Sequence, residues 1–205
     1  MPTFVALLRG VNNIGTARRV PMAELRALLS GLGYTGVTTL LNSGNAVFRA
    51  SGGTPAKHSA SIAAAILTQL KLEVPVIVKS ASELAAILSD SPINAGADAH
   101  SRFLVAFTRD IKALSSLAAI EPLVVPSEQF AVGRSAAYLL CSPRISESKA
   151  GRALLGKSGK SATTRNWATV LKLHALAMKA TPNPSIERTS SSRLRLLPAA
   201  THVKR

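Results

Sequence analysis

The sequence predicts an α+β protein made of two ferredoxin-like subdomains that pack together. The first 80 residues follow the order β-α-β-β-α-β, which is the split arrangement of a ferredoxin-like sandwich. A second series of short strands and helices fills residues 81–180, and regular periodicity stops at residue 181. We therefore predict one subdomain over 1–80, another over 81–180, and a disordered basic tail over 181–205.

The elements of the first half follow from its apolar pattern. Phe4–Leu8 is a continuous apolar run, typical of a buried strand. Pro21 suits the first position of a helix whose apolar residues recur every three or four positions until Gly33. Asn42-Ser43-Gly44-Asn45 is a hairpin turn signal. The remaining runs predict strands over 37–41 and 46–48, a helix over 56–71 and a strand over 74–78.

Shorter apolar runs divide the second half, on either side of a polar connector over 89–101. They predict a helix over 82–88, a strand over 103–107, a helix over 110–117, strands over 123–125, 130–132 and 137–141, and helices over 147–155 and 166–178. The apolar stripe of the last helix contains Trp167, Val170, Leu171, His174 and Met178.

Composition narrows the class of protein. Apolar residues make up 47% of the 205 and charged residues 17%, so a sizeable core can form. No apolar run reaches the roughly 18 residues of a membrane-spanning helix, and the first residues lack the basic segment of a secretory signal. One cysteine and four scattered histidines offer neither a disulfide framework nor metal-ligand spacing. We expect a cytoplasmic protein with no membrane association, no metal and no cofactor.

The charge balance favours anionic partners. The net charge is +15, and the sequence pI is near 11.1. Binding to phosphate backbones releases counterions, which favours basic proteins. The plainer explanation is that a basic surface keeps the protein soluble, and both explanations remain open.

The stretch Thr163–Trp167 is the strongest candidate for a functional site. It contains the one tryptophan of the chain, next to Arg165 and Asn166, where a helix is predicted to begin. Thr side chains can cap the free N–H groups of a helix start, and helix starts are suited to anions. Arg165 can fork onto a phosphate or carboxylate. The nearby cations Lys149, Lys157 and Lys160 would raise the local potential.

Each of these residues also has a structural interpretation. Trp167 could stack on a base, but it begins an apolar stripe, which favours a place in the core. Arg165 with Asn166 could instead hold the two subdomains together. We expect Arg165→Ala to weaken anion binding with the melting temperature nearly unchanged. An equal loss of stability and binding would assign Arg165 to the fold.

A second constellation lies near the predicted hairpin. It comprises Arg9, Asn12, Asn42, Ser43, Asn45 and Arg49. In a ferredoxin-like sheet the end of the first strand and the central hairpin can approach each other, so these side chains could complete a cleft. Asn side chains at such places often bond backbone groups of turns, which favours a structural role.

Residues 151–158 match the letter of the phosphate-binding loop pattern, G-x-x-x-x-G-K-[ST]. That loop needs a buried strand directly before it and a helix that begins at the Lys. Here the preceding strand ends about ten residues earlier, and the interior residues prefer helix. We interpret the segment as a helix that ends at Gly156, followed by a basic loop.

Four stretches together resemble the domain of unknown function 1697 family of small bacterial proteins, over about residues 2–179. They are Leu8–Asn12, Val20–Arg26, Asn42–Phe48, and Thr163–Trp167 with Thr169, Val170, Lys172 and Leu173. The resemblance implies two ferredoxin-like subdomains, and it carries over no activity, cofactor or catalytic residue. The chain departs from the family pattern at Asn13-Ile14, Ala168 and Leu171.

Three functions follow from these residues. The leading hypothesis is a non-catalytic binding module for an anionic ligand, either nucleic acid or a phosphorylated small molecule. The alternative is an enzyme of unknown reaction that acts on a phosphorylated or carboxylated substrate. A third possibility is an interaction protein that uses a sheet edge. Cys141 has no nearby His in the sequence and is interpreted as an inert small hydrophobe.

Overall fold

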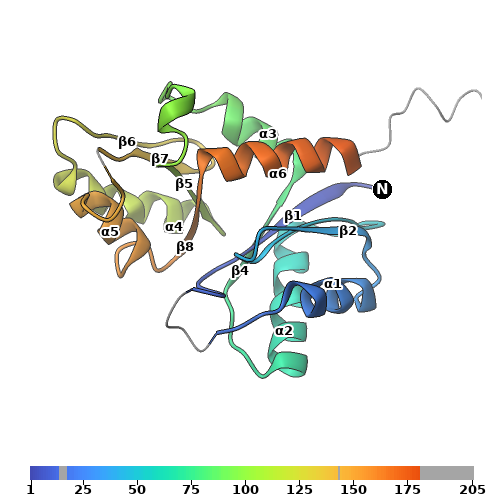
Figure 1. Ribbon diagram of the computed structural model, residues 1–205. Coiled ribbons are helices and arrows are strands. Elements are labelled where there is room, and N and C mark those ends of the chain that lie inside the picture. The colour runs from blue at the N-terminus through green and yellow to red at the C-terminus, as the bar shows by residue number, and fades with distance from the viewer. Residues whose placement is uncertain (14–17, 143, 181–205) are drawn as a thin grey trace, which may run out of the picture.

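Two four-stranded antiparallel sheets lie side by side in the computed structural model, which describes residues 1–13, 18–142 and 144–180 (Figure 1). The first sheet has the order β2-β3-β1-β4 and the second the order β6-β7-β5-β8. The strands of the first are β1 (Thr3–Leu8), β2 (Thr35–Leu40), β3 (Asn45–Arg49) and β4 (Val76–Ser80). Those of the second are β5 (Phe103–Thr108), β6 (Gln129–Val132), β7 (Ala137–Leu140) and β8 (Ala162–Asn166).

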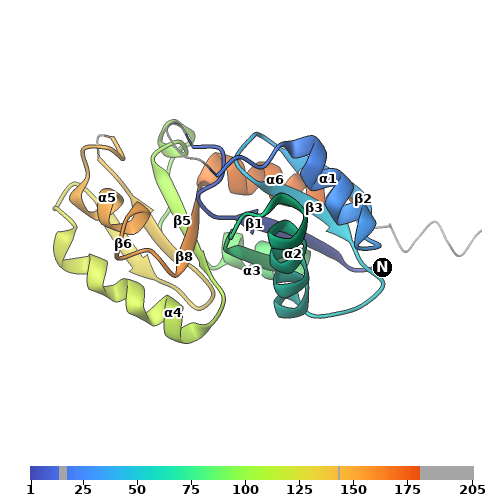
Figure 2. The ribbon, with the colours of Figure 1, turned by 90° about the horizontal axis from the view of Figure 1, so that it is seen from below.

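Helices cover the outer face of each sheet and the seam between them (Figures 1 and 2). In the first half they are α1 (Met22–Gly31) and α2 (Pro55–Leu70). Later in the chain come α3 (Ala81–Ser89), α4 (Ile111–Ser115), α5 (Lys149–Leu155), α6 (Trp167–Ala180) and the 3₁₀ segments η1 (Ala97–Ala99) and η2 (Ser116–Leu123). Local chemistry sets their starts: the Thr54 hydroxyl accepts the N–H of Lys57 ahead of Pro55, and Ser80 with Glu83 forms a capping box for α3.

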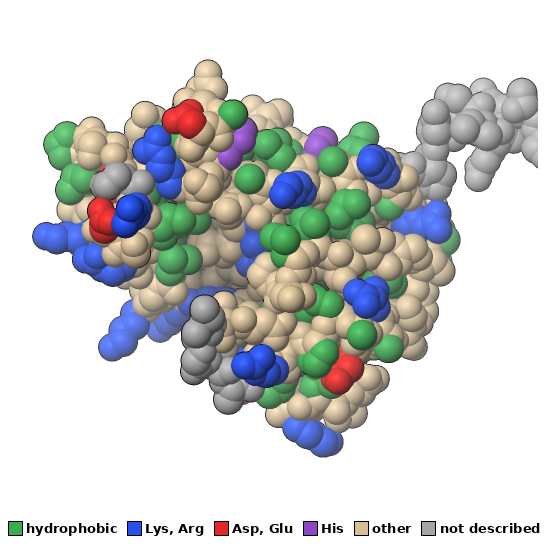
Figure 3. All heavy atoms as spheres, in the orientation of Figure 1, with side chains coloured by type: hydrophobic (Ala, Val, Ile, Leu, Met, Phe, Trp, Pro, Cys, Tyr) green, Lys and Arg blue, Asp and Glu red, His purple; other side chains and the backbone are tan. Residues whose placement is uncertain are grey.

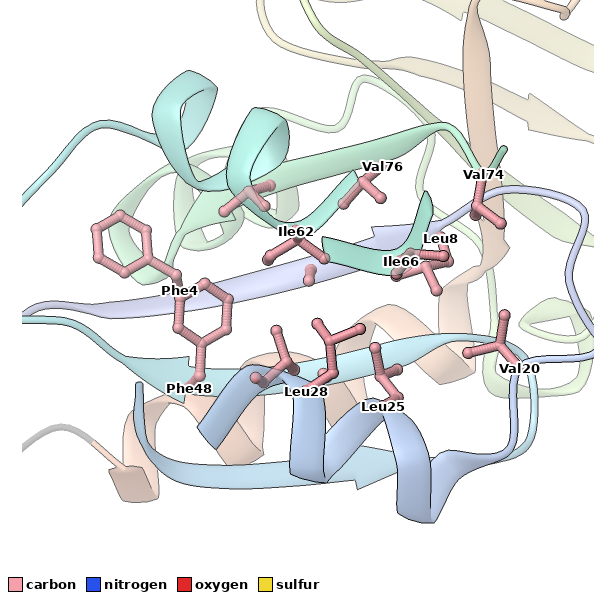
Figure 4. Close-up of a cluster of buried hydrophobic side chains, with 14 of the residues drawn as sticks. Phe4, Leu8, Val20, Leu25, Leu28, Phe48, Ile62, Ile66, Val74 and Val76 are labelled. Atoms are coloured by element: carbon pink, nitrogen blue, oxygen red, sulfur yellow. The ribbon is translucent and has the colours of Figure 1, made fainter. Parts of the chain in front are cut away.

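The central strand of each sheet is buried on both faces. In β1 the side chains alternate between two clusters: Phe4, Ala6 and Leu8 pack under α1 and α2, and Val5 and Leu7 point the other way. Figure 4 shows the first of these clusters, where Phe4 and Phe48 meet Leu28 and Ile62. Strand β5 alternates in the same way. A continuous apolar run is the pattern that such strands require.

The two sheets share one hydrophobic cluster, so their packing is part of the core. This shared core draws side chains from both sheets, α3 and α6. Its members include Val5, Leu7 and Val47 from the first sheet, Phe103, Val105 and Phe107 from β5, Leu84 and Ile87 from α3, and Val170, Leu173 and Ala177 from α6. Helix α6 therefore belongs to both halves, although it follows the last strand of the second.

The predicted α+β class is confirmed, and most elements fall within a residue or two of their expected positions. Both halves show the order β-α-β-β-α-β and the same strand order, which fits the ferredoxin-like arrangement; that finer name, and the division at residue 80, stay predictions. The tail over 181–205 lies outside the described residues.

One predicted strand was wrong, and one strand was missed. The strand expected over 123–125 does not exist, because Pro122 lies in the 3₁₀ segment η2 and the chain then turns without a partner strand. Strand β8 was missed, because its polar sequence was interpreted as a helix cap. It pairs with β5 along one sheet edge, and α6 begins at Trp167, directly after it.

The shared core predicts that the halves unfold together. Leu173→Ala should lower the free energy of unfolding by about 3 kcal/mol, because it opens a cavity between the sheets. Leu171→Ala on the same helix is the control: this side chain is 39% exposed and should matter by less than about 0.5 kcal/mol. Urea denaturation followed by tryptophan fluorescence and circular dichroism measures both. Separate transitions for the two halves would contradict the shared core.

Candidate functional site

The side chain of Arg165 crosses from the second sheet to the first. It leaves β8 and meets the end of β1 and the β2–β3 hairpin. One terminal nitrogen donates to the carbonyl of Leu8 at 2.7 Å and to that of Ser43 at 3.1 Å. The other donates to the Thr164 carbonyl at 2.7 Å and the Thr163 hydroxyl at 3.0 Å. Its Nε donates to the side-chain oxygen of Asn45.

The hairpin is shaped to receive this guanidinium. Gly44 has a φ of +72°, and a Cβ there would lie 2.6 Å from the side chains of both Leu8 and Val11. Only glycine permits this approach. It brings the Gly44 carbonyl to the N–H of Leu8 at 2.8 Å. Asn45 is fully buried and donates to the Leu40 carbonyl and the Ser43 hydroxyl, so its oxygen is left to accept from Arg165.

The charge of Arg165 is held by neutral oxygen atoms. In the described part of the chain no carboxylate forms an ion pair with it; its acceptors are carbonyl, hydroxyl and amide oxygens. Burial lowers the pKa of Arg165 to about 10, so the group remains protonated at neutral pH. The seam between the sheets therefore contains a positive charge that no acidic side chain of the described ranges pairs with.

A cleft of about 890 Å³ opens beside Arg165. Its walls come from the end of β1, the hairpin, β8, α5 and the start of α6. It is lined by Leu8, Arg9, Gly10, Val11, Asn13, Arg18, Leu41, Ser43, Leu154, Leu155, Ala162, Thr163, Thr164, Arg165, Asn166 and Thr169. Three of these side chains are arginines and none is acidic. Figure 3 shows a hollow between the two halves with basic side chains at its edge.

Arg9 and Arg18 supply the accessible charge of the cleft. Arg9 is half-buried and donates to the backbone carbonyls of Lys160 and Gly156 in the second half. Burial, and then repulsion from Arg18, lowers the pKa of Arg9. Arg18 is exposed, and its guanidinium approaches the backbone at Gly10. Two cations face each other here without an acidic partner among the residues described.

The start of α6 adds to the positive potential. Asn166 caps this helix, since its side-chain oxygen accepts the N–H of Thr169 at 2.9 Å. Both residues line the cleft, so the N-terminal end of a 14-residue helix lies at its wall. The partial positive charge of a helix start favours an anion nearby.

Some of the expected site residues line the cleft, and others form hydrogen bonds that stabilise the fold. Arg9, Arg165 and Asn166 line it. The N–H groups of Arg165 already donate within the protein, and its direct contact with an anion stays a prediction. The side-chain oxygen of Asn45 accepts from Arg165. The side-chain amide of Asn12 ties its loop: its nitrogen donates to the carbonyls of Val20 and Asn42, and its oxygen accepts the N–H of Val20.

Several expected residues lie away from the cleft wall. Trp167 stacks on Phe103 with ring centroids 4.7 Å apart, at the edge of the shared core, which is the structural alternative. The other outlying residues are exposed: Asn42, Lys149, Lys157 and Lys160. Of these, Asn42 and Lys160 contribute backbone carbonyls, which accept from Asn12 and Arg9.

Arg18 was missed by sequence reasoning. It follows a loop with no apolar periodicity, and nothing local distinguishes it from Arg19. Only the fold brings it beside Arg9.

The interpretation of residues 151–158 is confirmed. They form most of α5 and the turn after it, and the nearest preceding strand, β7, ends at Leu140. The segment is therefore not a phosphate-binding loop. Cys141 is buried, and burial raises the pKa of its thiol, as suits an inert core residue. Over the described ranges, no group of His, Cys, Asp or Glu could hold a metal ion, and no helix is long and apolar enough to cross a membrane.

The fold and cleft define a class: an α+β protein of two antiparallel sheets with a basic cleft at their seam. The family described as "Protein of unknown function (DUF1697)" matches residues 1–138, and the chain belongs to that family. No protein with a curated description matches it. A solved structure, the conserved bacterial protein SP0830 from Streptococcus pneumoniae, is 22% identical with a TM-score of 0.70, covering 86% of this chain and 98% of its own. That likeness shows the fold.

Arg165 is expected to stabilise the fold. Arg165→Ala leaves the carbonyls of Leu8 and Ser43 without their charged donor, and should lower the free energy of unfolding by about 3 kcal/mol. Arg165→Lys keeps the positive charge but loses the planar set of five N–H donors. It should therefore lower the free energy of unfolding by less than Arg165→Ala does, but still leave it below that of the unmodified protein. Urea denaturation of the three proteins measures this. If Arg165→Ala left the free energy of unfolding unchanged but weakened anion binding, Arg165 would be assigned to ligand binding and not to the fold.

Proposed function

We propose that this protein is a binding module for an anionic ligand, held in the cleft between the two sheets. The single observation that carries the proposal is the set of three arginines without a carboxylate in the cleft lining. Clustered cations repel one another, so bringing them together on folding costs free energy. The attraction to a bound anion would offset that cost. A phosphate or a nucleic-acid backbone is the partner that arginine recognises best.

The roles within the cleft differ. Arg9 is held in place by two carbonyls of the second half, and Arg18 approaches from the loop, so both can turn donors toward a ligand. Arg165 would act through its charge, because its donors are engaged. The start of α6 would face the same anion. A ligand whose negative charge exceeds one would suit this arrangement.

The cleft lining favours binding over catalysis. It contains hydroxyl groups of Ser and Thr, but no His, Cys, Asp or Glu that could act as a general acid or base. The enzyme hypothesis would need catalytic groups from the substrate or from another protein. The proposal includes a cytoplasmic location, since nucleic acids and phosphorylated metabolites are abundant there.

Replacement of Arg18 tests the cleft. Arg18→Ala should weaken the binding of inorganic pyrophosphate about tenfold, by the loss of one charge-assisted contact of ~1.4 kcal/mol. Arg19→Ala is the matched control: it is exposed, adjacent and outside the cleft lining, and should change affinity less than twofold (roughly 0.4 kcal/mol). Isothermal titration at low salt measures both. Equal affinity in Arg18→Ala and the unmodified protein would contradict the proposal.

A ligand retained through purification would identify the natural partner. We expect mass spectrometry of the denatured protein to find a phosphorylated compound or an oligonucleotide, in an amount reduced by Arg18→Ala. A retained compound without negative charge would contradict the proposal.

A further inference from the structure

The cleft is the first of three neighbouring hollows that follow the seam of the molecule. A hollow of about 380 Å³ shares Arg9 and Ala162 with the cleft. A third hollow, of about 510 Å³, lies beside α2 and shares Ile77 and Arg109 with the second. Because each neighbouring pair shares two lining residues, the three hollows follow one another along the seam. We call this series of hollows the seam groove.

Basic side chains recur along the whole seam groove. In order from the cleft they are Arg18, Arg9, Lys160, Arg109 and Lys79. The ion pairs in the described part of the chain are Arg102–Asp98 and Arg144–Glu147, and neither involves these residues. The five cations of the seam groove therefore lack acidic partners of their own among the residues described.

Two carboxylates border the seam groove, and both are engaged by backbone N–H groups. Asp110 accepts the N–H of Ala113 at 2.7 Å and caps α4. Glu83 accepts the N–H of Ser80 at 2.7 Å in the capping box of α3. These two carboxylates are outnumbered by the five cations, so the net charge of the seam groove is positive.

We propose that the seam groove binds an extended single-stranded nucleic acid along its phosphate backbone. This inference rests on the proposed function and names its ligand class. A phosphorylated small molecule would fill the cleft alone and leave Arg109 and Lys79 without a role. A strand with one charge per nucleotide can engage successive cations along the groove.

The lining also indicates how such a strand is read. No aromatic residue lines any of the three hollows, so bases have no platform on which to stack. The groove recognises the backbone, and affinity should be nearly independent of base composition. The lining does not distinguish ribose from deoxyribose, so both kinds of strand are tested.

Fluorescence anisotropy with labelled oligothymidylate and oligouridylate of about 16 nucleotides tests the proposal on the full chain. The logarithm of the binding constant should fall with the logarithm of salt concentration, with a slope of roughly −3.5 for five cations. Arg109→Glu should weaken binding about tenfold and make that slope shallower by roughly 0.7. Lys160→Glu, on an exposed loop, should also weaken binding and make the slope shallower. This second variant keeps the test valid if Arg109→Glu fails to fold.

Arg134→Glu is the matched control, because Arg134 is exposed at the β6–β7 turn and lines none of the hollows. It makes the same change in net charge as Arg109→Glu and should alter affinity less than about twofold. Equal weakening by both would show attraction to net charge and overturn the proposal. Tighter binding of duplex than of single strands would overturn it as well.

A length series separates this inference from the proposed function. Affinity should rise from a dinucleotide to about 16 nucleotides as the strand reaches successive cations. If affinity stopped rising at the dinucleotide while pyrophosphate still bound, the seam-groove proposal would be wrong and the cleft proposal would stand. Binding of neither pyrophosphate nor any strand would sink both.

Discussion

The bond network of Arg165 fixes the relation between the two sheets. A buried cation is costly unless its N–H groups are satisfied, and here carbonyls from the first sheet complete that requirement. Neither sheet alone supplies enough acceptors. The seam is therefore a place where the fold depends on a charge that it does not neutralise. An acidic residue at this position would also bind the guanidinium, but it would cancel the positive charge on which the proposed anion binding depends.

Packing of α6 on both sheets fixes the position of the positive charge at the seam. The shared core, which includes Val5, Val105 and Leu173, packs the two sheets against each other. Because α6 packs on both sheets, its capped start cannot move independently of β8 or the hairpin. The start of α6 and Arg165 are thus held in place by the fold. Under the proposed function, little conformational entropy of these groups would be lost on binding.

The sequence predicted the scaffold better than the site. Continuous apolar runs, as in Phe4–Leu8, identify strands buried on both faces, and the Asn42–Asn45 turn signal located the hairpin. Strand β8 escaped because most of its residues are polar: Thr163 and Arg165 bond to the first sheet across the seam. A polar strand at such a seam lacks the apolar alternation that sequence patterns detect. Pro122 produced the opposite error, since an apolar run beside it was taken as a strand.

The candidate residues divided according to whether their roles are local. Asn12 and Asn45 serve turns, as their residue type favours, and that could be argued from sequence. Arg165 was singled out from the sequence, but its hydrogen bonds to the first sheet depend on acceptors more than 100 positions away. Arg18 gave no signal, because its importance comes only from the arginine that the fold places beside it. Composition had already indicated an excess of cations, and the fold concentrates part of that excess along one seam. A basic surface that served solubility alone would not require five cations along one series of neighbouring hollows. This arrangement is the reason for proposing a linear polyanion as the partner.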